Sequence, residues 1–301
     1  MVNPAVLDYW LIMIEAIDRV DLAVSEELVD GYHRDGFMVI PALYAPGEIA
    51  AIRNRFDALA AAGQPVDTYW VPDLSPEAAG DPLKRYPRVM QPHRWDESIR
   101  QYLLHPRVYA VLRILLGEEP IAAQSMFYYK PPGARGQALH QDNFYLQVKP
   151  GSCIATWTAI DPAQPENGGL YVVPGTQDLA IVCPERANEK ESFVTHLVRP
   201  PAGKKAIPMR LASGDTLFFN GSLIHGSPPN RSQTQWRRSF ICHYIPASAT
   251  HISKWYAPLL NFDGSVVEFQ PSTDGGPCGK EFQGGNYGSY GKDVDNSQFG
   301  A

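Results

Sequence analysis

Three residues able to bind a metal ion fall within the strand-rich part of the sequence. His140 and Asp142 are separated by one residue inside a run, residues 139–146, that is predicted to be a strand. Because side chains alternate along a strand, these two would point to the same face. His225 follows an aromatic run at residues 215–219 and is the third candidate.

Two histidines and one carboxylate cover one face of an octahedral ion and leave three positions open, which is the donor set of non-haem iron(II) oxygenases. A keto acid can occupy two of these positions and dioxygen the third. A closed structural zinc site would need a fourth protein ligand, typically a thiolate, and none stands beside these residues. We therefore predict that His140, Asp142 and His225 are the metal ligands and the catalytic centre.

A basic residue that could bind a carboxylate follows the third ligand by twelve positions. Arg237 and Ser239 are again two residues apart on a predicted strand, so both could reach one ligand, whereas Arg238 would point the other way. The planar guanidinium matches a carboxylate, and the hydroxyl can donate a further hydrogen bond. This pair predicts a site for the distal carboxylate of a dicarboxylate co-substrate.

Other interpretations of these residues stay open at this point. An H-x-D sequence is common by chance: His140 could be a polar loop residue, Asp142 an Asx-turn residue and His225 a turn residue. The main alternative is a non-catalytic cupin-like protein that binds a metal or a small molecule. Such a protein would not need the carboxylate site formed by Arg237 and Ser239 near the metal. A zinc hydrolase using the same ligands lacks an obvious general base.

The ordered combination of motifs resembles the phytanoyl-CoA dioxygenase (PhyH-like) family of iron(II)/2-oxoglutarate oxygenases. The resemblance extends over about residues 35–257 and is densest at 126–244. It is carried by the sequence HQDN from His140, by Trp157, by the turn ENGG from Glu166, by PG from Pro174, by HGS from His225, and by Arg237.

The resemblance implies a double-stranded β-helix with an N-terminal helical layer, Fe(2+) as the metal, and 2-oxoglutarate and O2 as co-substrates. The implied reaction is hydroxylation or another oxidation of a small organic metabolite with release of succinate and CO2. Residues that match the family's 2-oxoglutarate contacts are Met126, Gln141, Trp157, Ser227 and Arg237. An upstream basic residue of the family could correspond to Arg85 or Arg88. Halogenating relatives have a small residue in place of the carboxylate, so Asp142 favours hydroxylation.

The surrounding pattern predicts a helical front and a strand-rich back. Helices are expected over 25–33, 46–63 and 106–117, with a short strand at 37–40 and an irregular stretch at 68–92. Further strands are expected at 121–129, 139–146, 153–160, 170–173, 215–219 and 236–245. We interpret this as an all-β jelly roll with α additions, forming one domain over 1–301: a mainly helical layer (1–117), the jelly-roll core (118–260) and a Gly-rich tail (261–301) that is either a lid or disordered.

Composition excludes several other classes of protein. The 301 residues carry a formal net charge of −6, with no basic cluster for nucleic acid. No apolar run is long enough to cross a bilayer, so we predict a cytoplasmic protein. The four cysteines show no metal-binding or disulfide spacing and are expected to be reduced. The other six histidines are expected to be structural. The residues that could line a substrate pocket are Tyr69, Trp70, Tyr128, Phe144 and Tyr145, although aromatic residues more often belong to the core.

Overall fold

The computed structural model describes residues 24–272 and residue 278. Its N-terminal part forms the predicted helical layer. Helix α3 begins at Pro46, buries Ile49, Ile52, Phe56 and Leu59 at helical spacing, and ends at Gly63, whose φ of 63° closes the last turn. The helices are α2 (Glu26–Asp35), α3 (Pro46–Ala62), α4 (Pro82–Arg85), α5 (Glu97–Leu103), α6 (Pro106–Leu116) and α7 (Asn143–Leu146), with 3₁₀ turns η1 (Pro76–Ala78), η2 (Pro92–Arg94), η3 (Pro165–Asn167) and η4 (Lys254–Tyr256).

The larger sheet has eight strands in the order β1-β10-β5-β12-β3-β14-β15, with β2 paired to β3. All of these pairs are antiparallel, and β12 is central because it pairs with β5 on one side and β3 on the other. The strands are β1 (Phe37–Ile40), β2 (Val89–Met90), β3 (Pro120–Tyr128), β5 (Ile154–Ala159), β10 (Thr216–Asn220), β12 (Ser239–Pro246), β14 (Leu259–Leu260) and β15 (Val266–Val267).

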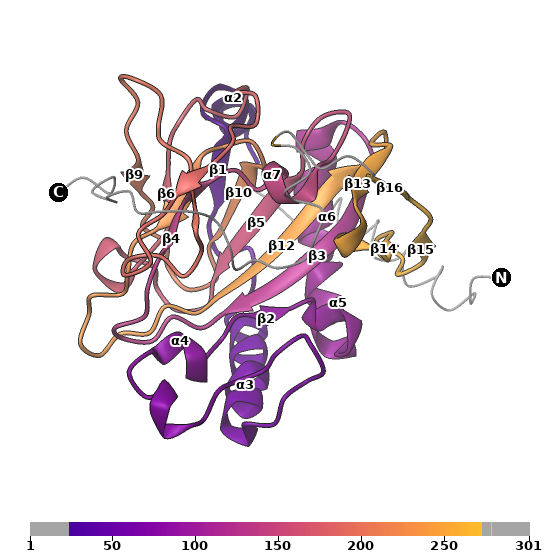
Figure 1. The fold of residues 1–301 in the computed structure, drawn as a ribbon. Coiled ribbons are helices and arrows are strands. Elements are labelled where there is room, and N and C mark those ends of the chain that lie inside the picture. The colour runs from indigo at the N-terminus through magenta and orange to yellow at the C-terminus, as the bar shows by residue number, and fades with distance from the viewer. Residues whose placement is uncertain (1–23, 273–277, 279–301) are drawn as a thin grey trace.

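The smaller sheet has four strands in the order β4-β11-β6-β9 and faces the larger one, which completes the jelly roll (Figure 1). Two short strand pairs, β13–β16 and β7–β8, form separate two-stranded sheets. The remaining strands are β4 (Gln137–His140), β6 (Tyr171–Val172), β7 (Glu185–Arg186), β8 (His196–Leu197), β9 (Ile207–Pro208), β11 (His225–Ser227), β13 (His251–Ser253) and β16 (Gln270–Ser272).

Alternation along the strands of the larger sheet separates two cores. On β3, Met126 faces the space between the sheets, whereas Phe127 faces the helices and stacks on Phe56 of α3 at a ring-centroid distance of 3.9 Å. Strand β12 repeats this pattern with Ile241 facing inward and Phe240 facing the helices. Helices α3, α5 and α6 therefore cover the outer face, and the inner face is left to form the site.

Most predicted elements are confirmed, with three differences. The expected strand at 139–146 is wrong: β4 ends at His140 and α7 follows at once. The stretch at 68–92 contains α4 and β2. The expectation of four reduced cysteines is also wrong, because Cys183 and Cys278 form a disulfide, while Cys153 and Cys242 are free and buried.

Two further expectations concern the Gly-rich tail and the possibility of a membrane-spanning helix. Most of the Gly-rich tail, residues 273–277 and 279–301, lies outside the described residues. The expectation that this tail is a lid or disordered therefore stays a prediction. Within the residues that are described, no helix is both long and apolar enough to span a bilayer.

Candidate metal centre

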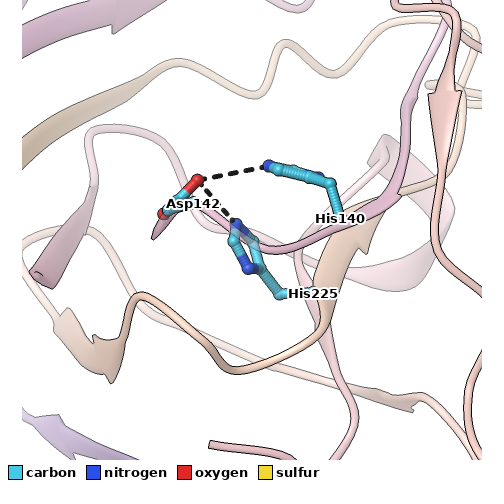
Figure 2. Close-up of side chains that lie close together, drawn as sticks. All are labelled: His140, Asp142 and His225. Atoms are coloured by element: carbon cyan, nitrogen blue, oxygen red, sulfur yellow. Dashed lines mark ion pairs between the residues drawn. The ribbon is translucent and has the colours of Figure 1, made fainter. Parts of the chain in front are cut away.

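The three predicted ligands converge at the end of the smaller sheet (Figure 2). His140 is the last residue of β4, and His225, the first residue of β11, lies directly opposite it in the antiparallel register. Asp142 lies just beyond β4 with helical backbone angles (φ −63°, ψ −37°). The carboxylate therefore reaches the histidines through the turn into α7, and not through the strand alternation that the sequence argument assumed.

The geometry of these side chains suits one metal ion. Asp142 Oδ1 lies 3.3 Å from His140 Nε2 and 3.6 Å from His225 Nε2, and one ligand atom from each residue falls within 4.8 Å of the others. All three residues are buried. Nδ1 of His140 lies 2.8 Å from the Ala138 carbonyl and Nδ1 of His225 lies 3.0 Å from the Leu223 carbonyl. Each Nδ1–H thus donates to a carbonyl, which leaves the Nε2 lone pair directed at the site.

Electrostatics favour the protonation states that bind metal. Burial alone would raise the pKa of Asp142, but His225 and His243 together with hydrogen bonds hold it well below its usual value. Burial lowers the pKa of His225 to about 4, so its imidazole is neutral near pH 7. An ionised carboxylate and neutral imidazoles are the forms that coordinate a divalent cation.

His243 is a residue of the site that the sequence argument missed. Its Nε2 lies 2.9 Å from Asp142 Oδ2, the carboxylate oxygen that does not face the two histidines. Because Nε2–H can donate there, His243 fixes the rotation of the carboxylate. The signal was present in the sequence: His243 follows Arg237 by six residues on one predicted strand, and an even spacing places both on the same face.

Arg237 is almost fully buried beside this centre. Its Nε donates to the Gly168 carbonyl at 3.0 Å, its Nη1 donates to Ser239 Oγ at 2.8 Å, and its guanidinium carbon lies 5.2 Å from the centre of the Trp157 ring. Burial lowers its pKa to about 10, so it is still a cation at neutral pH. None of the ion pairs found among residues 24–272 and 278 includes it. A buried cation with neutral partners favours an anionic ligand.

A cavity of about 90 Å³ connects Arg237 with the three ligands. Four of the residues predicted to contact the co-substrate lie in its wall: Met126, Trp157, Ser227 and Arg237. The other two lie elsewhere: Ser239 stands behind Arg237, and the Gln141 amide bonds to the Ser222 carbonyl and to Val182 N. Of the two upstream arginines left open by the sequence, Arg88 lines the cavity; Arg85 is not part of its wall.

The opposite wall comes partly from a loop to which the sequence assigned no role. Residues 194–196 join Tyr145 and Tyr256 there, and the Tyr145 hydroxyl lies 3.1 Å from His196 Nδ1. Of the five residues predicted to line a pocket, Tyr128 and Tyr145 do so. Trp70 is instead buried in the core between the helices and the larger sheet.

Comparison with known proteins agrees with this geometry. The model of the family described as phytanoyl-CoA dioxygenase (PhyH) matches residues 32–239. The chain is 27% identical over 248 residues to the peroxisomal phytanoyl-CoA dioxygenase of Bos taurus, covering 79% of this chain and 73% of that protein. It is 30% identical over 166 residues to phytanoyl-CoA dioxygenase 1 of Oryza sativa, covering 54% and 58%.

Solved structures show the same fold. The epimerase SnoN in complex with Fe3+, alpha ketoglutarate and nogalamycin RO matches with a TM-score of 0.61 at 23% identity, covering 76% of this chain and 86% of that one. EctD from S. alaskensis, with 2-oxoglutarate and 5-hydroxyectoine, matches with a TM-score of 0.59 at 20% identity, covering 76% and 78%. With the family match and the metal-binding geometry taken together, the chain belongs to the phytanoyl-CoA dioxygenase (PhyH) family of iron(II)/2-oxoglutarate-dependent dioxygenases.

Proposed function

We propose that this dioxygenase hydroxylates a small organic metabolite, with conversion of 2-oxoglutarate and O2 to succinate and CO2. The observation that carries the proposal is the convergence of His140, Asp142 and His225 beside the buried cation of Arg237, with one cavity joining them. A metal site alone would fit many activities. A metal site with an arginine in the wall of the same cavity, where it could bind a carboxylate, fits a keto diacid co-substrate.

The residues present fit iron(II) by the chemistry of their donors. Two imidazole Nε2 atoms and one carboxylate would hold the ion on one face and leave adjacent positions open. When bound, iron(II) supplies the activation of O2 that drives oxidative decarboxylation of the keto acid. The protein's own part is to bind and orient: Arg237 would bind the distal carboxylate, Ser227 would donate a hydrogen bond to it, and the Trp157 ring would form the side wall.

The carboxylate ligand supports hydroxylation over halogenation, because Asp142 occupies the position that a halide would need. For the substrate, the support comes from the opposite wall of the cavity. Tyr145, Tyr256 and Leu146 offer apolar and aromatic surface, and His196 adds a polar group to it. We therefore propose a substrate that has an apolar carbon skeleton with a polar substituent.

Cellular location stays a prediction of the sequence. The expected cytoplasmic location must be weighed against the Cys183–Cys278 disulfide, since disulfides are rare in reducing compartments. Four mammalian relatives that the chain matches, those of Bos taurus and Homo sapiens among them, are described as peroxisomal. Localisation of a tagged full chain would test the prediction.

The test is succinate release and O2 consumption by the full chain with iron(II), 2-oxoglutarate and a panel of small metabolites. We expect succinate formation to require iron and to increase with a true substrate. Changing His225 to Ala should abolish turnover, because it removes one of three ligands.

The co-substrate assignment has its own test. Arg237→Met should raise the apparent KM for 2-oxoglutarate by about ten- to a hundredfold, the value of a lost charge-assisted hydrogen bond. The matched control is Arg210→Met, because Arg210 is exposed and is not part of the cavity wall. Succinate formation that survives chelation or the loss of His225 would contradict the proposal.

A further inference from the structure

Lys130 is a buried lysine that the proposed reaction does not use. It follows strand β3 and is only 2% exposed. Its Nζ donates to the Gly168 carbonyl at 3.1 Å, to Ser227 Oγ at 2.8 Å and to the Pro228 carbonyl at 2.5 Å. Across the described ranges 24–272 and 278, no carboxylate is paired with it. Burial and the neighbouring Arg237 hold the pKa of Lys130 well below its usual value, so keeping this amine here is costly and indicates that it has a role nearby.

The backbone around Lys130 is shaped to fit its side chain. Gly168 has a φ of +77°, and a Cβ added there would lie 2.8 Å from Lys130 Cε and 2.9 Å from Lys130 Nζ. Only glycine leaves room for the lysine at this turn. The same Gly168 carbonyl accepts from both Lys130 and Arg237, so the two side chains share one oxygen. Their donors are thus held together directly behind the cavity wall that Ser227 and Arg237 form.

Lys130 also determines what Ser227 can do. Its Nζ already contacts three acceptors, so it has no donor left for a ligand and must act through its neighbours. Ser227 Oγ accepts from Lys130, which leaves the Ser227 O–H as a donor. Ser227 lines the cavity, and its hydroxyl has no acceptor in the part of the chain that the structure describes. The cavity therefore ends in donors and positive charge, which suits a carboxylate.

We propose that Lys130 is a positioning residue for the co-substrate: it fixes Ser227 as a donor and, with Arg237, makes the site prefer a keto diacid to a keto monoacid. This inference rests on the proposed function. It predicts that Lys130 acts on the distal carboxylate and leaves the keto acid end unaffected.

Equilibrium binding of two ligands that differ at one end tests the inference without turnover. 2-Oxoglutarate is compared with 2-oxopentanoate, in which a methyl group replaces the distal carboxylate, by anaerobic calorimetry on the iron(II)-loaded full chain. Lys130→Met should weaken 2-oxoglutarate binding about tenfold and 2-oxopentanoate binding by less than about threefold. The matched control is Lys84→Met, because Lys84 is exposed and undergoes the same substitution.

A second comparison separates positioning from a structural role. In a Ser227→Ala background, Lys130→Met should weaken 2-oxoglutarate binding clearly less than it does in the wild type, because the two residues act through one hydrogen bond. Should Lys130→Met fail to fold in a thermal unfolding assay, Lys130→Gln keeps an amide donor group, which is too short to replace all three contacts, and the same preferential loss of 2-oxoglutarate binding is expected.

Different results overturn different claims. Equal weakening of both ligands, or no weakening of either, in the Lys130 variants refutes the inference. Failure of the wild-type protein to bind 2-oxoglutarate refutes the proposed function itself, and the inference with it.

Discussion

Changing Gly226 to Ala tests how tightly the metal centre depends on the contact between β4 and β11. Gly226 follows the ligand His225, and its backbone lies against β4. A Cβ at this position would lie 2.8 Å from the Gln137 carbonyl oxygen, 2.9 Å from Leu139 N and 3.0 Å from the Ala138 carbonyl carbon. All three are backbone atoms, so no flexible side chain can move aside.

The size of the effect follows from these distances. Ordinary contacts begin at 3.4 Å, so the closest one requires the two strands to separate by 3.4 − 2.8 = 0.6 Å. Overpacking of this kind costs about 1–3 kcal/mol of stability. Metal–ligand distances are fixed to within about 0.2 Å, and the separating strands carry His140 and His225 opposite one another. We therefore expect metal affinity to fall by about ten- to a hundredfold, the range seen when support of a ligand is lost.

The assay is anaerobic titration of iron(II), or of manganese(II) as a redox-stable substitute, with thermal unfolding of the apo protein measured in parallel. Gly47→Ala is the matched control, because an added Cβ at Gly47, in helix α3, has no atom within 4 Å. Wild-type metal affinity in the Gly226 variant would show that strand spacing does not set the ligand geometry, and the reasoning would be refuted.

Two other predictions follow from buried histidines. His243→Ala removes the hydrogen bond to Asp142 Oδ2 and should lower metal affinity by about tenfold or more in the same titration, whereas unchanged affinity would mean that the carboxylate is held by other contacts. Burial and two nearby arginines lower the pKa of His93 to about 3, so it stays neutral when folded but takes up a proton when unfolded. The stability it contributes is present above pH 6.5 and is lost as the pH falls towards 3, by at most about 1.4 kcal/mol per pH unit. Denaturant unfolding of wild type and His93→Asn between pH 4 and 7 should show a shallower slope in the variant, and parallel curves would contradict the assignment.

The three candidate metal ligands named from the sequence do lie together in the structure, but for a partly different reason. Strand alternation was assumed to bring His140 and Asp142 together, whereas the strand ends at His140 and a helical turn supplies the carboxylate. A strand's last residue is poorly marked when aromatic residues follow it, because Phe and Tyr are acceptable in a strand and in a short helix. The sequence therefore identified which side chains come together, but not the backbone path that brings them together.

The co-substrate residues show where local pattern is insufficient. The even spacing of Arg237 and Ser239 suggested two contacts with one ligand, yet Ser239 accepts from Arg237 and so supports it from behind. Long-range packing decides such roles. The disulfide between Cys183 and Cys278 spans 95 residues, and no spacing rule could have indicated it. In contrast, helix α3 and strand β1 were readable because caps and periodicity are local signals.

The central position of β12 has a consequence for how the two sides of the cavity can change in evolution. Ser239, which supports the arginine, and His243, which supports the carboxylate ligand, lie four residues apart on a strand paired on both sides, a span of about 13 Å set by the strand repeat. That length sets how far the arginine lies from the carboxylate ligand. Because β12 is an inner strand, insertions in surface loops would leave this distance unchanged. The wall facing His196 comes instead from a loop, which tolerates change far more easily. New substrates can therefore be acquired on one side of the cavity while the shared oxidising half of the reaction is inherited intact.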